Sequence, residues 1–180
     1  MSTIYTSTEV QINYPSLFEA KQFTNGGAKF GAMLLINKND KESLDVINTA
    51  IEEAIKSGNL LDNGNLRLPL RDGDIEHPGE LAFNNKYYLN AYSAHQPTVV
   101  DRDALPITNK REFSPGTFVK VAIRFYSYSH SQQGVAAEIL GVQQVAEGTL
   151  ESQQPKEEIS FSAIQEDDEF VEIDEDDFLN

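Results

Sequence analysis

Residues 116–129, which read G-T-F-V-K-V-A-I-R-F-Y-S-Y-S, carry cations and aromatic rings at alternate positions. Side chains two residues apart share one face of a β-strand, so this segment would present them in one row. Cations neutralise phosphates and aromatic rings stack on bases, which together can grip single-stranded nucleic acid without reading its sequence. The row consists of Lys120, Ala122, Arg124, Tyr126 and Tyr128.

The opposite face of the same segment is apolar and holds Val119, Val121, Ile123 and Phe125. β-Branched and aromatic residues that alternate with period two predict a strand whose apolar face lies in the core. The ordinary alternative is an antiparallel strand whose outer tyrosines pack beneath a loop.

A second segment, residues 86–94, repeats the pattern of a base with tyrosines on its even positions. Two strands with such a face favour nucleic-acid binding over simple packing. A register shifted by one residue would give these roles to Tyr87 and Phe118 instead. Cations on loops could extend the track. The expected DNA-binding residues are Lys86, Tyr88, Tyr92, Lys120, Arg124, Tyr126 and Tyr128, with Arg71, Arg102, Lys110 and Arg111 on loops.

Several shorter strands must position these residues. Residues 9–14 alternate and predict a strand that stops at Pro15, and residues 16–24 then read as a connector. An Asn-Gly-Gly turn leads into a strand over residues 28–37.

Residues 41–57 carry an apolar stripe at helical spacing and predict the one clear helix. Asn39 or Asp40 can cap its start, and Gly58 ends it. We expect this amphipathic helix to plug an open face or end of a barrel.

The remaining strands complete a mainly β fold. Residues 98–100 and 135–145 predict two more strands, with a bulge or bend at Gly141, and Pro69 marks an edge piece. Many short strands with one helix predict a small, mostly antiparallel barrel.

Charge divides the chain into two parts. The net charge is −15, and residues 151–180 hold 12 of the 29 acids but one of the 14 bases. We therefore expect a folded domain over residues 1–150, able to present a basic face, and a disordered acidic tail over 151–180. Apolar residues interrupt the acids, which predicts a role beyond solubility. The candidate partner-binding residues are Phe170, Ile173, Asp174, Glu175, Asp176, Asp177 and Phe178.

Catalytic chemistry is not expected. The chain has no cysteine and no P-loop. Asp72, Asp74, Glu76 and His77 resemble a metal cluster in composition, but they occupy a turn-forming stretch where short acids are common. We expect no metal, no cofactor and no enzyme activity. Without an apolar run of about 20 residues, we expect no membrane association and a cytoplasmic location.

Several segments resemble a family of phage-encoded single-stranded DNA-binding proteins in the same order along the chain. They are residues 67–74, 88–91, 99–102, 116–128 and 134–137, and the likeness spans about residues 8–150. The tail is similar in style to the acidic tail of T7-type phage single-stranded DNA-binding proteins, although Leu179 and Asn180 follow Phe178 here.

The resemblance implies an OB-fold that binds single-stranded DNA in phage DNA replication and recombination. It also implies that the tail recruits replication proteins such as a polymerase, helicase or nuclease. Because the acidic tail is a polyanion tethered to the domain, we also expect it to compete with DNA for a cationic groove. A homodimer is compatible with the sequence. If phage-encoded, the protein acts in the host cytoplasm.

The alternative is a phage structural or interaction protein, or a DNA-mimic inhibitor that uses its acidic tail. A mimic needs a rigid acidic surface, whereas here the acids concentrate in the segment least suited to fold.

Overall fold

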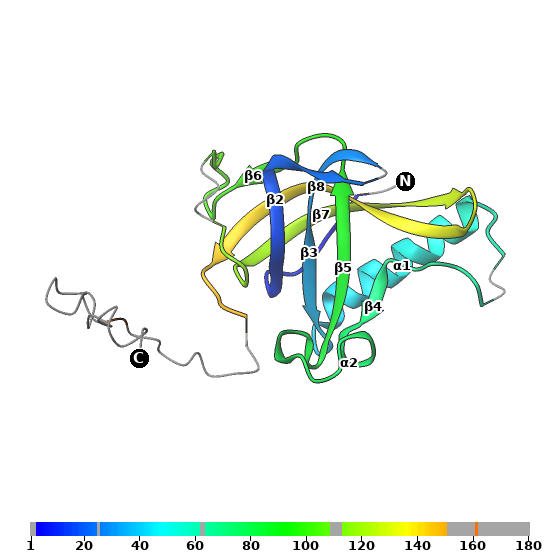
Figure 1. The fold of residues 1–180 in the computed structure, drawn as a ribbon, viewed down its shortest axis with the longest axis horizontal. Coiled ribbons are helices and arrows are strands. Elements are labelled where there is room, and N and C mark those ends of the chain that lie inside the picture. The colour runs from blue at the N-terminus through cyan, green and yellow to red at the C-terminus, as the bar shows by residue number, and fades with distance from the viewer. Residues whose placement is uncertain (1–2, 25, 62–63, 109–112, 151–160, 162–180) are drawn as a thin grey trace, which may run out of the picture.

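The computed structural model describes residues 3–24, 26–61, 64–108, 113–150 and 161. Figure 1 shows a β-barrel with one long helix beside it. Five strands close the barrel in the order β2–β3–β5–β8–β7, and β7 pairs back onto β2. The five are β2 (Val10–Phe23), β3 (Gly27–Asn37), β5 (Lys86–Ser93), β7 (Phe118–Ser129) and β8 (Gln133–Ala146).

All neighbouring strands of the barrel run antiparallel except β5 and β8, which run parallel. This closed five-stranded barrel confirms the expected OB-fold. Two short strands extend the sheet: β1 (Ile4–Tyr5) pairs with β7, and β6 (Thr98–Val100) pairs with β8 in parallel. The bulge expected at Gly141 is present, because the register of β8 against β7 shifts between the partners of Ala122 and Ile123.

The period-two pattern of β7 is confirmed. Val119, Val121 and Ile123 are 0% exposed and lie in the main core, whereas Lys120, Ala122 and Arg124 are only partly buried. The barrel is therefore held by one apolar face of each strand, and the outer faces are left for other contacts.

The expected end of the first strand at Pro15 is wrong. β2 continues through Pro15 to Phe23, so the segment expected to be a connector is strand. Proline is tolerated here because the pairing with β3 is interrupted by a bulge between Asn13 and Ser16. Tyr14 takes a φ of 47° in this bulge, and its amide donates to the side-chain oxygen of Asn13.

The helix α1 (Lys41–Ser57) has the predicted bounds. Asp40 caps it, since its carboxylate accepts from the Ser43 amide at 3.2 Å, and Gly58 follows its last turn. The helix packs against β7, β8 and β1 with Ile47 and Ile51 in the core, and so covers one side of the barrel as expected.

A small layer covers the first half of β5. It consists of β4 (Leu70–Asp72), the short helix α2 (Gly73–Glu76) and a 3₁₀ turn, Leu81–Phe83. Figure 1 shows α2 and β4 beside the lower end of β5. Leu35, Phe83 and Tyr88 form a second apolar cluster beneath it.

Among the described residues, no helix is long and apolar enough to cross a membrane. The expected loop contacts Lys110 and Arg111 lie outside the described residues, as do the tail residues Phe170, Ile173 and 174–178.

Candidate nucleic-acid interface

One row of register partners crosses the outer face of four neighbouring strands. Gly31 of β3 is the register partner of Tyr92 on β5, and Tyr92 is the partner of Glu138 on β8. Glu138 is in turn the partner of Arg124 on β7. The two segments predicted from sequence are therefore not adjacent strands; β8 lies between them and joins their outer faces.

Tyr92 occupies the space that a side chain at position 31 would need. A Cβ built on Gly31 would collide with Cδ1 of the Tyr92 ring, so the ring lies across β3. Its other neighbour is Phe23, whose ring centroid is 5.0 Å away in an edge-on arrangement. Burial raises the pKa of Tyr92 above its usual value.

Arg124 and Glu138 form an ion pair on this face. Both Nη2 and Nε of Arg124 donate to the same oxygen, Oε2 of Glu138, at 2.6 Å and 3.1 Å. The arginine side chain remains 40% exposed. The pair therefore fixes the guanidinium while leaving it open to solvent.

Tyr126 and Tyr128 continue the row along β7. Tyr126 is 37% exposed. Its pKa is raised by burial, and next by the nearby charge of Glu138. The Tyr128 ring lies over Gly134 of β8, where a Cβ would meet its hydroxyl and Cζ. We call Tyr92, Arg124, Tyr126, Tyr128 and Glu138 the central patch.

Lys120 lies on the same face of β7, beyond the central patch. Its ammonium is 6.0 Å from the centre of the Tyr5 ring. Together with parts of β6 and β8 they line an open hollow of about 460 Å³. Arg102 is exposed in the turn after β6, and its carbonyl accepts from Gln143, the register partner of Lys120.

Tyr88 is not placed to stack on a base. The ring is 6% exposed and packs edge-on against Phe83, with centroids 5.3 Å apart, and its hydroxyl donates to Glu76. At Tyr88 the structure therefore agrees with the alternative reading of the pattern, in which an outward-facing tyrosine packs beneath a covering segment and does not bind nucleic acid. Tyr87 lies on the opposite face of β5 from Tyr92, and Lys38 lies 5.2 Å from its ring centre.

Lys86 and Arg71 are also engaged away from the central patch. Lys86 donates to the side chain of Gln11 at 3.0 Å. Arg71 donates to both oxygens of Glu76 at 3.1 Å and 3.2 Å, and it lies next to Tyr88. The Tyr88 hydroxyl and then Arg71 hold the pKa of Glu76 below its usual value.

The three acids that resembled a metal cluster form ion pairs with lysine and arginine side chains. Lys38 bridges Asp72 at 2.8 Å and Asp74 at 2.7 Å, and these bonds lower the pKa of both carboxyl groups. His77 stacks on Phe83 with ring centroids 4.0 Å apart. Within the described part of the chain, no group of three or more potential metal ligands is present.

A second group of rings and cations was not predicted from the sequence. We call it the hairpin patch, and it consists of Lys21, Phe23 and Lys29. Lys21 and Lys29 are register partners across the β2–β3 hairpin, and Lys21 lies 5.8 Å from the Phe23 ring centre. Like charges directly opposite each other are unfavourable unless an anion is near. The lysine–ring spacing was visible in the sequence, but the misplaced end of β2 hid that these residues share a face with Tyr92.

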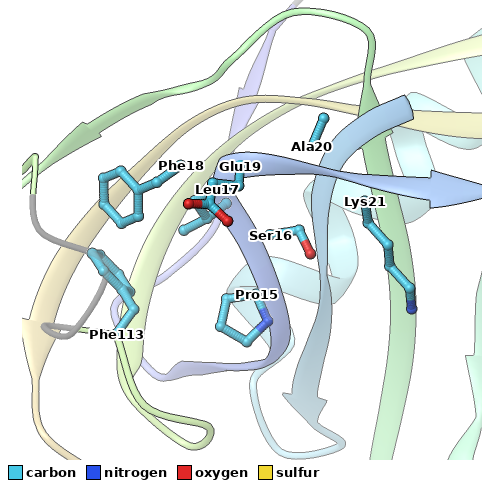
Figure 2. Close-up of a pocket in the computed structure, with 8 residues that line it drawn as sticks. All are labelled: Pro15, Ser16, Leu17, Phe18, Glu19, Ala20, Lys21 and Phe113. Carbon is cyan, nitrogen blue, oxygen red and sulfur yellow. The ribbon is translucent and has the colours of Figure 1, made fainter. Parts of the chain in front are cut away.

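A further hollow of about 330 Å³ borders the hairpin patch. Figure 2 shows it inside the bend of β2, with Pro15, Lys21 and Phe113 around it. Ser16 on its wall is the register partner of Gly31, so the hollow adjoins the row that contains Tyr92.

The barrel and its outer face place the chain in the class of OB-fold proteins. The sequence profile of the family described as "Enterobacter phage Enc34, ssDNA-binding protein" matches residues 2–171. The chain belongs to this family. Protein p50 of Acyrthosiphon pisum secondary endosymbiont phage 1 is 33% identical over 152 residues, which cover 77% of this chain and 81% of that protein.

Two solved structures share the fold. The single-stranded DNA-binding protein from bacteriophage Enc34 in complex with ssDNA is 20% identical, with a TM-score of 0.73 over 82% of this chain and 88% of that one. Gp2.5, a single-stranded DNA-binding protein of bacteriophage T7, is 14% identical, with a TM-score of 0.59 over 90% and 99% of the two chains. These findings confirm the resemblance in family and fold.

Replacing Gly31 by alanine should destabilise the protein by about 1–3 kcal/mol, because the new Cβ overpacks against Tyr92 and the β5 backbone. Urea unfolding measures this change. Gly26→Ala is the matched control in the same hairpin, since the nearest atom there is 3.7 Å from the added Cβ. Equal stability of the two variants would contradict the seating of Tyr92 on Gly31.

Proposed function

We propose that the chain binds single-stranded DNA without sequence requirement through the central patch and the hairpin patch. Arg124 and the hairpin lysines Lys21 and Lys29 contact phosphates. The rings of Tyr92, Tyr126, Tyr128 and Phe23 stack on bases. Lys120 and Arg102 extend the track along β7, and Lys110 and Arg111 remain candidates on the loop before it.

One observation carries the proposal: the two patches are continuous on one surface through the contact of Phe23 with Tyr92. Rings and cations that follow one another in this way match the physical requirement for a single strand. Part of the position agrees with the way OB-folds use the face of their second and third strands and the loops beside it, while Arg124, Tyr126 and Tyr128 lie on β7. In this chain those strands are β3 and β5, and the loops are the tips of the β2–β3 and β7–β8 hairpins.

Stacking and phosphate contacts, rather than base-edge contacts, would supply most of the affinity, as a protein that coats any exposed strand needs. We propose that this coating serves phage DNA replication and recombination. The family relatives named for single-stranded DNA support the ligand.

We further propose that residues 151–180 act as a tethered polyanion. The segment that follows β8 is held against the barrel, because the side-chain amide of Gln11 donates to the Thr149 carbonyl at 3.2 Å. A flexible tail of 30 residues would span about 30 Å, enough to reach across a small barrel. The tail would occupy the cationic face in the absence of DNA and, once displaced, offer Phe170, Ile173 and Phe178 to replication proteins.

Tyr126→Ala should weaken binding to a fluorescent oligo-dT by about 5- to 150-fold, because removing a stacked ring costs about 1–3 kcal/mol. Anisotropy titration at fixed salt measures it. Tyr88→Phe is the control, since its ring is buried; it should bind like the wild type while unfolding at lower urea. If Tyr126→Ala binds oligo-dT as tightly as the wild type, Tyr126 does not stack on a base.

Lys120→Ala should make the dependence of log K on log salt less steep by about 0.7, the contribution of one phosphate contact on a single strand. Titrations at several salt concentrations give the slope. Lys41→Ala, at an exposed position on α1, should leave it unchanged. If both variants keep the wild-type slope, Lys120 does not contact the DNA.

A chain ending at residue 150 should bind oligo-dT more tightly than the full chain, and the difference should shrink as salt rises, because screening weakens the competing tail. Anisotropy titrations at low and moderate salt compare the two forms. Equal affinity at low salt would exclude competition by the tail.

A further inference from the structure

Glu138 is a carboxylate in the middle of a surface that we propose binds a polyanion. It lies on β8 between Tyr92 of β5 and Arg124 of β7. A negative charge here repels phosphates, so it lowers affinity unless it makes a favourable contact of its own.

The ion pair with Arg124 uses one of the two carboxylate oxygens. Both bonds from Arg124 end on Oε2, and within the described part of the chain no partner contacts Oε1. The Glu138 side chain is 23% exposed, so it is not closed off from a bound strand. Arg124 therefore orients the carboxylate and offsets its charge while leaving one acceptor open.

An ionised carboxylate can only accept hydrogen bonds. The sugar–phosphate backbone of DNA offers acceptors along its length, so the donors available to Glu138 are the N–H groups of the bases. A base stacked on Tyr92 or Tyr126 would turn its edge along the surface toward the position between these rings.

We propose that Glu138 accepts a hydrogen bond from the amino group of a stacked base, so that the chain favours amino-bearing bases over thymine. Cytosine presents its N4 amino group and adenine its N6 amino group to such an acceptor. Thymine offers a single N–H between two carbonyl oxygens, which repel the carboxylate. This inference rests on the proposed function and makes Glu138 its specificity-determining residue.

The test compares two oligonucleotides of equal length, one of thymidine and one of 5-methyldeoxycytidine. Both bases carry the same methyl group and differ only in the edge that Glu138 would read. Anisotropy titration of the full chain should show about fivefold tighter binding of the 5-methylcytosine strand, the value of one modest hydrogen bond.

Glu138→Gln should bring this ratio close to one, because its amide can also donate to a thymine carbonyl. It should also raise the affinity for thymidine, since a charge has been removed. Glu53→Gln, at an exposed position of α1, removes the same charge elsewhere and should keep the wild-type ratio.

Equal binding of the two strands by the wild-type chain would overturn the inference, even if the Gln variant failed to fold. A ratio that survives in Glu138→Gln would overturn it as well, and would leave Glu138 with the sole task of holding Arg124. Failure to bind either strand would instead overturn the proposed function itself.

Discussion

The parallel pairing of β5 with β8 is the contact on which the candidate interface depends. It is short, with Ala91 opposite Ala137 and Tyr92 opposite Glu138. It closes the barrel and also sets the tyrosine of one strand beside the ion pair of the next two. Without this pairing, Tyr92 and Arg124 would belong to separate surfaces, and no continuous row of rings and cations would exist.

Two glycines make room for the rings of this surface. Tyr92 lies across Gly31 and Tyr128 lies over Gly134, so each ring rests on the neighbouring strand. Rings held in this way lose little further freedom when a base stacks on them, which lowers the entropic cost of binding. Elsewhere the same residue type is used for packing, as Tyr88 shows beneath α2.

The charged side chains are divided in the same way as the tyrosines, between internal contacts and the exposed outer face. The acids of the β4–α2 layer are paired with nearby cations: Asp72 and Asp74 with Lys38, which follows β3, and Glu76 with Arg71. The cations on the outer face include the hairpin lysines Lys21 and Lys29 and also Lys120, which lies 6.0 Å from the Tyr5 ring centre. Arg124 belongs to the same face, and its side chain stays 40% exposed although it pairs with Glu138. A chain with a net charge of −15 can thus keep a local surface suited to an anion.

Much of the fold was predictable because it depends on local patterns. The faces of β7 follow from its period-two alternation, and the bounds of α1 follow from its apolar stripe, the cap at Asp40 and Gly58. What the sequence could not supply was the set of neighbours. Tyr88 is buried because residues 73–83 fold over it, and no pattern within residues 86–94 reveals that cover.

The same limit applies to the interface. Glu138 lies between Tyr92 and Arg124 because β5 and β8 pair in parallel, and these strands are far apart in the sequence. Local periodicity does not predict which distant strands pair or in which register. The hairpin patch was missed because Pro15 reads as the end of a strand, and the bulge that accommodates it becomes visible only in the pairing with β3.

The most direct test of the central claim is an NMR titration of the isotope-labelled full chain with oligo-dT. If the central patch and the hairpin patch bind the strand, the largest amide and ring shifts fall on Phe23, Gly31, Tyr92, Glu138 and residues 124–128. Shifts confined to α1 or to residues 70–83, with the central patch unchanged, would contradict it.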